Sequence, residues 1–299
     1  MVKIAQSWLG DMFKQFVSAA KILTRQVQPG MSLKVRPDDT FLVSYPKSGN
    51  TWMRFLIANL LQQDPPVGLL DADSLIPSVD AKSKRFFDEM KSPRVIKSHF
   101  CFDPRYPKVI YIVRDPRDVV ISEYHYQRKT RRISDDYTLE EYVPRFLMGK
   151  TWPENGSWAQ HVATWVTARE SDPGFLLIRY ETLLASTTHE LARMASFLGV
   201  SVTSQRLSEV VERSSADRMR TLEALQSEQS SLMKGSRKDI AFVRSAKSGG
   251  WKSDLTEPMV AKIEAAWSPI MRYLGYELRF PTSVDGVDPT AFAFSKMLQ

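Results

Sequence analysis

The sequence predicts an α/β fold in which a parallel β-sheet is flanked by helices. Four short apolar runs, rich in β-branched and aromatic residues, are separated by longer stretches with helical periodicity. Each run is apolar along nearly its whole length, which is typical of strands buried on both faces of a parallel sheet. The predicted strands are residues 41–45, 94–97, 109–113 and 175–180.

Helical patterns occupy the segments between and after these strands. In such a sheet, ligands bind beyond the carboxyl ends of the strands, so the residues that follow each strand are the first candidates for chemistry. The predicted helices lie near residues 51–63, 116–128, 138–148, 157–170, 186–198, 204–213 and 258–273.

The composition is that of a globular protein with a sizeable core. The chain has 299 residues, 43% of them hydrophobic and 25% charged, which excludes collagen-like, coiled-coil and wholly disordered proteins. Its one cysteine, Cys101, excludes an internal disulfide framework and a multi-cysteine metal site. We expect no transmembrane helix and a cytoplasmic location, because long apolar runs and a signal-peptide pattern are missing. The net charge of +7 indicates an anionic partner without identifying it.

One α/β domain with an N-terminal extension accounts for the length. Residues 1–37 form the predicted extension, in which the pattern over 3–27 predicts an amphipathic helix. That helix would pack on the body of the fold or make a peripheral membrane contact. Residues 38–299 form the predicted domain, and the segment around 214–257 is expected to be partly mobile over a site because it lacks strong periodicity.

A phosphate-binding loop is predicted directly after the first strand. Residues 45–52 read Tyr-Pro-Lys-Ser-Gly-Asn-Thr-Trp and lead into a helix, so backbone N–H groups and the positive helix end can face one anion. The loop is not a Walker A motif, because its lysine precedes its glycine. An ordinary turn with a lysine on its rim is the alternative. The candidate donors are Lys47, Ser48, Gly49, Asn50 and Thr51.

The ends of the second and third predicted strands also have candidate ligand-binding residues. Arg114 ends the third strand, and Asp115 with Pro116 is a good start for the next helix, which places Ser122 two turns along it. Arg114 and Ser122 could hold a second anion, or Arg114 could pair with a nearby aspartate. Lys97 ends the second strand and His99 lies two residues later. Residues two apart in a strand share a face, so both can point at one ligand.

His99 is placed to act as a general base, although a lone histidine is more often structural. The other histidines fall within helical patterns and have no zinc-site spacing, so we interpret them as structural or solvent-facing. They are His125, His161 and His189.

At these positions the sequence resembles the cytosolic-type sulfotransferases that use 3′-phosphoadenosine 5′-phosphosulfate (PAPS). Residues 45–52 resemble the family's 5′-phosphosulfate loop, Y-P-K-S-G-T-T-W, and residues 108–122 resemble its 3′-phosphate segment. Residues 92–99 resemble its S-P-R-[IV]-[IV]-K-[ST]-H run, which ends in the catalytic histidine. The likeness extends to 180–181 and 249–252 and covers about residues 38–280 in the family's order.

The resemblance implies a P-loop-NTPase-like sulfotransferase fold and a nucleotide-binding transferase that consumes PAPS, releases PAP and needs no metal. It implies that the 5′-phosphosulfate is held by Lys47, Ser48, Gly49, Asn50, Thr51 and Trp52. Trp52 would also stack on adenine, while Arg114 and Ser122 would bind the 3′-phosphate. The adenosine would be lined by Tyr180 and the Ser214–Ser215 pair, and Phe242 and Arg244 would close on the nucleotide.

The sequence departs from the family pattern in four places. Asn50 replaces a threonine, and Ser214-Ser215-Ala216 replaces T-S-F. Arg244-Ser245-Ala246 replaces R-K-G and removes one lysine, for which Lys247 or Arg237-Lys238 could compensate. The family's dimer motif survives only as Lys252 and Thr256, so the sequence does not predict the oligomeric state.

The implied mechanism is an in-line attack. His99 removes a proton from an acceptor hydroxyl or amine, and Lys47 and Lys97 stabilise the negative charge that develops on the leaving oxygen. The expected acceptor is a small alcohol, phenol or lipid-like molecule. Its pocket could be walled by aromatic residues, some of which could equally be core, namely Phe86, Phe87, Phe100, Phe102, Tyr106, Tyr137, Phe146, Trp152 and Trp158.

Two other functions compete with this interpretation. A nucleotide kinase would need a Walker A loop and magnesium ligands, which the sequence lacks. A non-catalytic binder is suggested by the altered strip at 244–246 but opposed by the intact set of candidate catalytic and phosphate-binding residues. A nucleic-acid partner is not expected, because the basic residues are dispersed. The basic run at 128–132 is either a solvated face or an attraction for an anionic acceptor or membrane.

Overall fold

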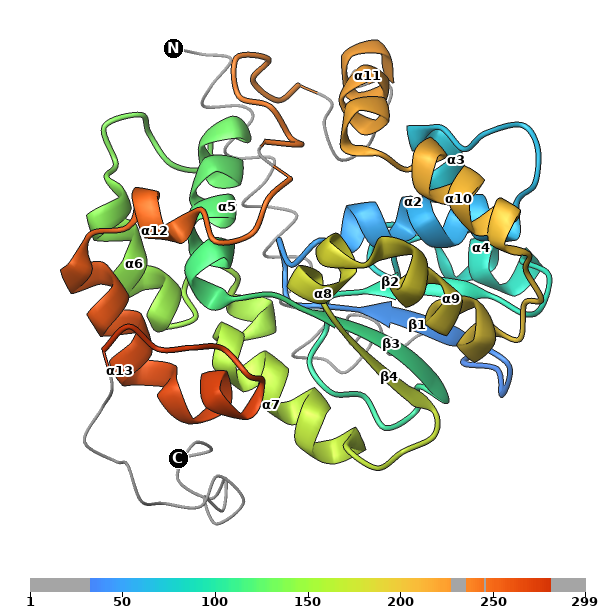
Figure 1. Cartoon of the computed structure of the whole chain (residues 1–299), viewed down its shortest axis with the longest axis horizontal. Coiled ribbons are helices and arrows are strands. Elements are labelled where there is room, and N and C mark those ends of the chain that lie inside the picture. Colours follow the sequence, from blue (N-terminus) through green and yellow to red (C-terminus); the bar gives the residue numbers. More distant parts are fainter. Residues whose placement is uncertain (1–32, 227–234, 245, 281–299) are drawn as a thin grey trace.

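A four-stranded parallel sheet forms the centre of the protein (Figure 1). The structure, a computed structural model, describes residues 33–226, 235–244 and 246–280. The strand order is β2-β1-β3-β4, which confirms the predicted parallel sheet. The strands are β1 (Thr40–Val43), β2 (Val95–Ser98), β3 (Lys108–Val113) and β4 (Phe175–Arg179). The helix predicted over residues 3–27 lies outside the described residues.

Both faces of this sheet are buried, which explains the uninterrupted apolar runs. Phe41 and Val43 belong to one hydrophobic core and Leu42 to the other, because successive side chains of a strand point to opposite faces. In β3, Tyr111 and Ile112 divide in the same way. A strand buried on both faces has little room for polar residues, and those in β2, Lys97 and Ser98, lie at its carboxyl end.

The helices pack on the sheet in two groups. One core joins the sheet to α2 (Asn50–Leu61), α3 (Leu69–Leu75), α8 (Tyr180–Ala185), α9 (Thr187–Leu198), α10 (Ser204–Arg213) and α11 (Ala216–Gln226). The other core joins it to α4 (Lys84–Glu89), α5 (Pro116–Lys129), α6 (Leu139–Leu147), α7 (Trp158–Arg169), α12 (Trp251–Asp254) and α13 (Glu257–Tyr273). A short 3₁₀ helix, η1 (Pro153–Asn155), precedes α7. Figure 1 shows α2, α8, α9 and α10 on one side of the strands and α7 on the other.

The sequence predicted the longer helices closely, and the structure confirms each within two residues at either end. The helices it missed are α3, α4, α8 and α12, which are too short for periodicity to register, and α11. Helix α11 falls in the segment 214–257, where we expected no clear structure. No helix in the described ranges is long and apolar enough to span a lipid bilayer.

Candidate active site

A cavity of about 440 Å³ lies where the carboxyl ends of the four strands meet. Each strand delivers a lining residue immediately or shortly after its last residue: Lys47 after β1, His99 after β2, Arg114 after β3 and Tyr180 after β4. This is the edge of the sheet at which a parallel α/β fold binds ligands. The sequence motifs therefore converge on one place.

The loop between β1 and α2 depends on a glycine. Gly49 has φ of 101°, and a Cβ placed there would lie 2.5 Å from Cδ2 of Tyr180. Only glycine allows the loop backbone to approach the Tyr180 ring in this left-handed conformation. The buried Oγ of Ser48 and Oδ1 of Asn50 have no hydrogen-bond partner in the described part of the chain. The hydroxyl can donate to an anionic ligand beside the helix N-terminus, whereas the amide oxygen can only accept.

Lys47 is clamped between two aromatic rings. Its Nζ lies 4.2 Å from the ring centre of Tyr126 and 4.3 Å from that of Phe242. Burial, reinforced by the nearby Arg114 guanidinium, lowers the pKa of Lys47 to about 7. A buried cation held in this way is stabilised when an anion enters the cavity.

The orientation of His99 is set by the backbone after β1. Nδ1 of His99 lies 2.7 Å from the carbonyl oxygen of Ser44, which can only accept a hydrogen bond. In neutral His99, Nδ1 therefore carries the proton and Nε2 keeps its lone pair. Burial and the nearby Lys97 hold the pKa of His99 well below its usual range, which keeps the ring neutral at pH 7.

Lys97 lines the same cavity two residues before His99. Its side chain is buried, and burial together with the positive charge of Arg54 lowers the pKa of Lys97 to about 8. The predicted common face of the two residues agrees with this placement. His161 supports the arrangement from α7, since its Nε2 lies 2.9 Å from the carbonyl oxygen of His99.

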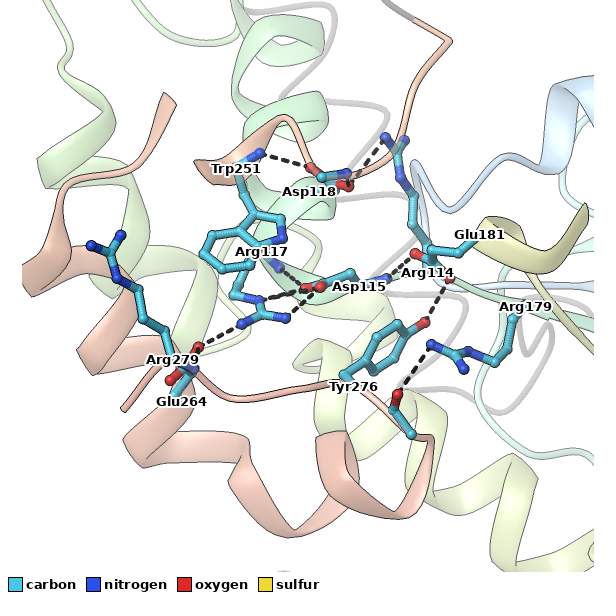
Figure 2. A network of polar contacts seen from close by, with 12 residues as sticks. Arg114, Asp115, Arg117, Asp118, Arg179, Glu181, Trp251, Glu264, Tyr276 and Arg279 are labelled. Atoms are coloured by element: carbon cyan, nitrogen blue, oxygen red, sulfur yellow. Dashed lines mark hydrogen bonds and ion pairs between the residues drawn. The ribbon is translucent and has the colours of Figure 1, made fainter. Parts of the chain in front are cut away.

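Arg114 reaches the cavity across the ring of Tyr180, with its guanidinium carbon 4.3 Å from the ring centre. It donates to the carbonyl oxygen of Lys247 at 3.0 Å, and its ion-pair separation from Asp118 is 3.9 Å. The Asp118 carboxylate also accepts the backbone N–H groups of Gly249, at 2.7 Å, and Trp251, at 3.0 Å. Figure 2 shows the contact with Trp251. Asp118 thereby fixes the strip of residues 246–251 to α5. Ser122 lines the same cavity further along α5.

A buried ion cluster holds this end of α5 in place (Figure 2). Arg117 pairs with Asp115 at 2.6 Å and Glu264 at 2.5 Å, and its guanidinium carbon lies 3.8 Å from a ring centre of Trp251. Asp115 also caps α5, with Pro116 in the first turn, as the sequence predicted. The cluster joins α5, α12 and α13, and so stabilises the wall that carries Arg114.

Trp52 lies edge-on to Tyr180, with ring centres 5.9 Å apart, and both residues line the cavity. Its indole Nε1 donates to the carbonyl oxygen of Ser214 at 3.0 Å. The Ser214 hydroxyl is buried and accepts from the Asn59 amide at 3.3 Å, and Ser214 is not among the residues that line the cavity. Ser48 is buried in the same way and does not line the cavity.

The strip that departs from the family pattern is placed in part. Phe242 and Arg244 line the cavity, as do Val243 and Ala246, and Arg244 pairs with Asp254 at 3.3 Å. Ser245 lies outside the described residues. Arg237 pairs with Asp135 and Asp239 at a separate surface hollow, so it does not supply the missing lysine.

Few of the aromatic residues suggested for the pocket wall line it. Phe100 and Trp152 do, whereas Tyr106 stacks on Phe41 in the core at 3.5 Å between ring centres. The remainder belong to or pack against the same core, namely Phe86, Phe87, Phe102, Tyr137, Phe146 and Trp158. Tyr126 also lines the cavity and was not predicted from the sequence, although it follows Ser122 by four residues on one helix face.

Comparison with known proteins shows that the chain is similar to sulfotransferases. The family model described as "Sulfotransferase domain" matches residues 37–275. Human sulfotransferase 2B1 is 32% identical over 250 residues, which cover 80% of this chain and 67% of that protein. The 3-beta-hydroxysteroid sulfotransferase of Cavia porcellus is 30% identical over 262 residues, 83% of this chain and 88% of that protein.

Solved structures give the same result. The mouse sulfotransferase SULT7A1 complexed with PAP is similar with a TM-score of 0.63 and 25% identity, covering 81% of this chain and 87% of that one. A retinol dehydratase complexed with retinol and PAP has a TM-score of 0.65 at 20% identity, covering 83% and 85%, and shows likeness of fold.

Proposed function

The chain belongs to the sulfotransferase domain family, and from this premise we propose how its cavity works. The protein is a PAPS-dependent sulfotransferase, with PAP as its product. We propose that its acceptor is a hydroxyl or amine of a small or lipid-like molecule and that His99 is the general base. The observation that carries the proposal is the neutral His99 imidazole, oriented by Ser44, in a cavity shared with Lys47 and Lys97.

The cavity has the donor groups that the nucleotide requires. PAPS supplies the sulfonate group and departs as PAP. The loop around Gly49 at the N-terminus of α2, with Lys47 and Thr51 lining the cavity beside it, suits its 5′-phosphosulfate. Arg114, whose buried Nε has no partner in the described part of the chain, suits the 3′-phosphate together with Ser122 and Arg244. Trp52 and Tyr180 offer ring faces to the adenosine, with Ser214 holding Trp52.

His99 takes the acceptor proton at Nε2. A base must be neutral before it can accept a proton, and burial keeps His99 neutral at pH 7. The imidazolium that forms is stabilised by its Nδ1–H donating to the Ser44 carbonyl oxygen. Proton transfer from the acceptor makes its oxygen or nitrogen a stronger nucleophile.

Lys47 and Lys97 stabilise the charge that develops on the leaving oxygen. A preorganised donor of this kind contributes about 3 kcal/mol to lowering a barrier. The rings of Tyr126 and Phe242 restrict the Lys47 ammonium to one position, so little reorganisation is needed at the moment of reaction.

The direct test is to incubate the protein with sulfur-labelled PAPS and a panel of phenols, alcohols, amines and lipids. Transfer of label to an acceptor, lost in His99→Ala, is the expected result. Tight PAP binding without transfer to any acceptor would favour the non-catalytic binder instead. The cytoplasmic location and the domain division at residues 37 and 38 stay predictions of the sequence.

A further inference from the structure

Arg132 lines both the active-site cavity and a separate hollow on the surface. It follows α5 and lines the active-site cavity. It also lines an outer hollow of about 740 Å³, formed by residues 128, 131–135 and 235–239. Its guanidinium carbon lies 5.0 Å from a ring centre of Trp152, which lines the cavity beside it. Arg132 therefore stands where the cavity opens outward.

The neighbouring arginines are already engaged. Arg128 pairs with Asp135 at 3.0 Å, Arg237 pairs with Asp135 and Asp239, and Arg131 donates to the carbonyl oxygen of Gly235 at 3.1 Å. Among the described residues, the guanidinium of Arg132 has neither a carboxylate nor a carbonyl oxygen within bonding distance. Within the described ranges, the printed side-chain contact of Arg132 is the indole face of Trp152, which leaves its N–H donors available there for a ligand.

A stack of rings separates Arg132 from the reacting end of the cavity. Lys47 lies over Tyr126, Tyr126 stacks on Trp152 with ring centres 6.1 Å apart, and Arg132 lies over Trp152. Lys47 and Arg132 thus contact opposite ends of the stacked Tyr126–Trp152 pair. Lys47, Arg114 and Arg244 are assigned to the nucleotide, and Lys97 to the leaving oxygen. Among the cations that line the cavity in the described residues, Arg132 is left to face the acceptor.

From this placement we propose that the acceptor carries an oxyanion, such as a carboxylate, at the end opposite its reacting hydroxyl, and that Arg132 binds it. The inference rests on the proposed function, because it takes His99 as the point where the hydroxyl reacts. The acceptor's apolar body lies along Phe100 and Trp152, both of which line the cavity. A guanidinium binds a carboxylate through two parallel hydrogen bonds, which gives both affinity and orientation.

Two lining groups, Asp80 and Glu154, would favour the opposite charge. Glu154 lies in η1, and a cationic acceptor would be drawn to either carboxylate. The test therefore compares three phenols of matched length: para-propylphenol, para-hydroxyphenylpropanoate and para-(aminopropyl)phenol. Their tails are neutral, anionic and cationic.

The kcat/KM of each phenol is measured at saturating PAPS for the wild type, Arg132→Gln and Arg145→Gln. Binding of each phenol to the protein–PAP complex is measured by calorimetry, so that an answer does not depend on turnover. Arg145 is the matched control, because it is an exposed arginine on α6 that lines neither opening.

We expect the wild type to prefer the carboxylate phenol to the neutral one by about tenfold, equivalent to about 1.4 kcal/mol. Arg132→Gln should abolish that preference and leave PAP affinity unchanged, while Arg145→Gln retains it. A wild-type preference for the neutral or cationic phenol, or for none, would overturn the inference, as would an unchanged preference in Arg132→Gln. Preferential binding of the carboxylate phenol without sulfonation of any phenol would overturn the proposed function alone.

Discussion

Nδ1 of His99 lies 2.7 Å from the carbonyl oxygen of Ser44, the residue that directly follows β1. The contact joins the ends of two adjacent strands, since β1 pairs with β2 and His99 follows β2. It determines which nitrogen of the neutral imidazole has the free lone pair. The backbone of one strand thus orients the side chain proposed as the base on the next.

Replacing His99 should separate catalysis from nucleotide binding. We expect His99→Ala to lower kcat by about 10²- to 10⁴-fold, the usual contribution of a general base. The affinity for PAP, measured by calorimetry, should stay within about twofold, because His99 holds no part of the nucleotide in the proposed arrangement. His189→Ala is the control, since that histidine is exposed on α9. Wild-type turnover in His99→Ala would rule out the assignment.

PAP affinity should fall as the pH rises above about 7. Burial lowers the pKa of Lys47 to about 7 in the free protein, and a bound anion raises it because it favours the charged form. Binding therefore takes up a proton between the free and bound pKa values, and the dissociation constant grows by up to about tenfold per pH unit there.

Calorimetry between pH 7 and pH 9 checks this dependence, since the phosphates of PAP are already largely ionised in that range. Lys47→Arg keeps its charge throughout and should flatten the curve. An equally steep curve in Lys47→Arg would mean that another group takes up the proton.

Asp118 should matter to the nucleotide although it does not line the cavity. Its carboxylate accepts two backbone N–H groups of the strip 246–251, and an amide in its place can accept from one and opposes the other. We expect Asp118→Asn to lower the free energy of unfolding by about 1–3 kcal/mol and PAP affinity by about tenfold. Asp64→Asn, which loses an exposed ion pair with Arg213, should change stability by less than about 1 kcal/mol. Equal effects of the two substitutions in thermal unfolding would contradict this role.

Ala246 has φ of 51°, in the left-handed region that favours glycine. Ala246→Gly should raise the free energy of unfolding by about 1 kcal/mol, because glycine takes up this conformation without strain. Ala241→Gly in the same segment is the matched control, because Ala241 lacks the positive φ and its replacement should lower stability. Denaturant unfolding distinguishes the two, and a loss of stability in both variants would count against the strain.

The sequence predicted the sheet and the long helices because both have periodic signatures. It also placed Lys47, His99 and Arg114 at one end of the sheet, since parallel strands bring their carboxyl ends together. Local patterns of this kind determine where the chain turns and which residues lie just after each strand.

Contacts between distant segments were beyond the sequence. Nothing in the residues around Ser214 shows that its hydroxyl meets Asn59, which lies 155 positions away. The contact of Lys47 with the Phe242 ring could not be predicted either, because Phe242 belongs to a segment without clear periodicity. The aromatic residues near 86 and 146 looked like pocket wall because composition does not distinguish a cavity lining from a core.

The buried Glu264 carboxylate affects where a recombinant fragment of the domain can end. It accepts the backbone N–H groups of Arg279, at 3.1 Å, and Phe280, at 2.8 Å, while Tyr276 donates its hydroxyl to Glu181 (Figure 2). The family model ends at residue 275, before all three donors. A recombinant fragment trimmed to that boundary would leave two carboxylates short of partners beside the wall that carries Arg114, so expression boundaries should extend through residue 280.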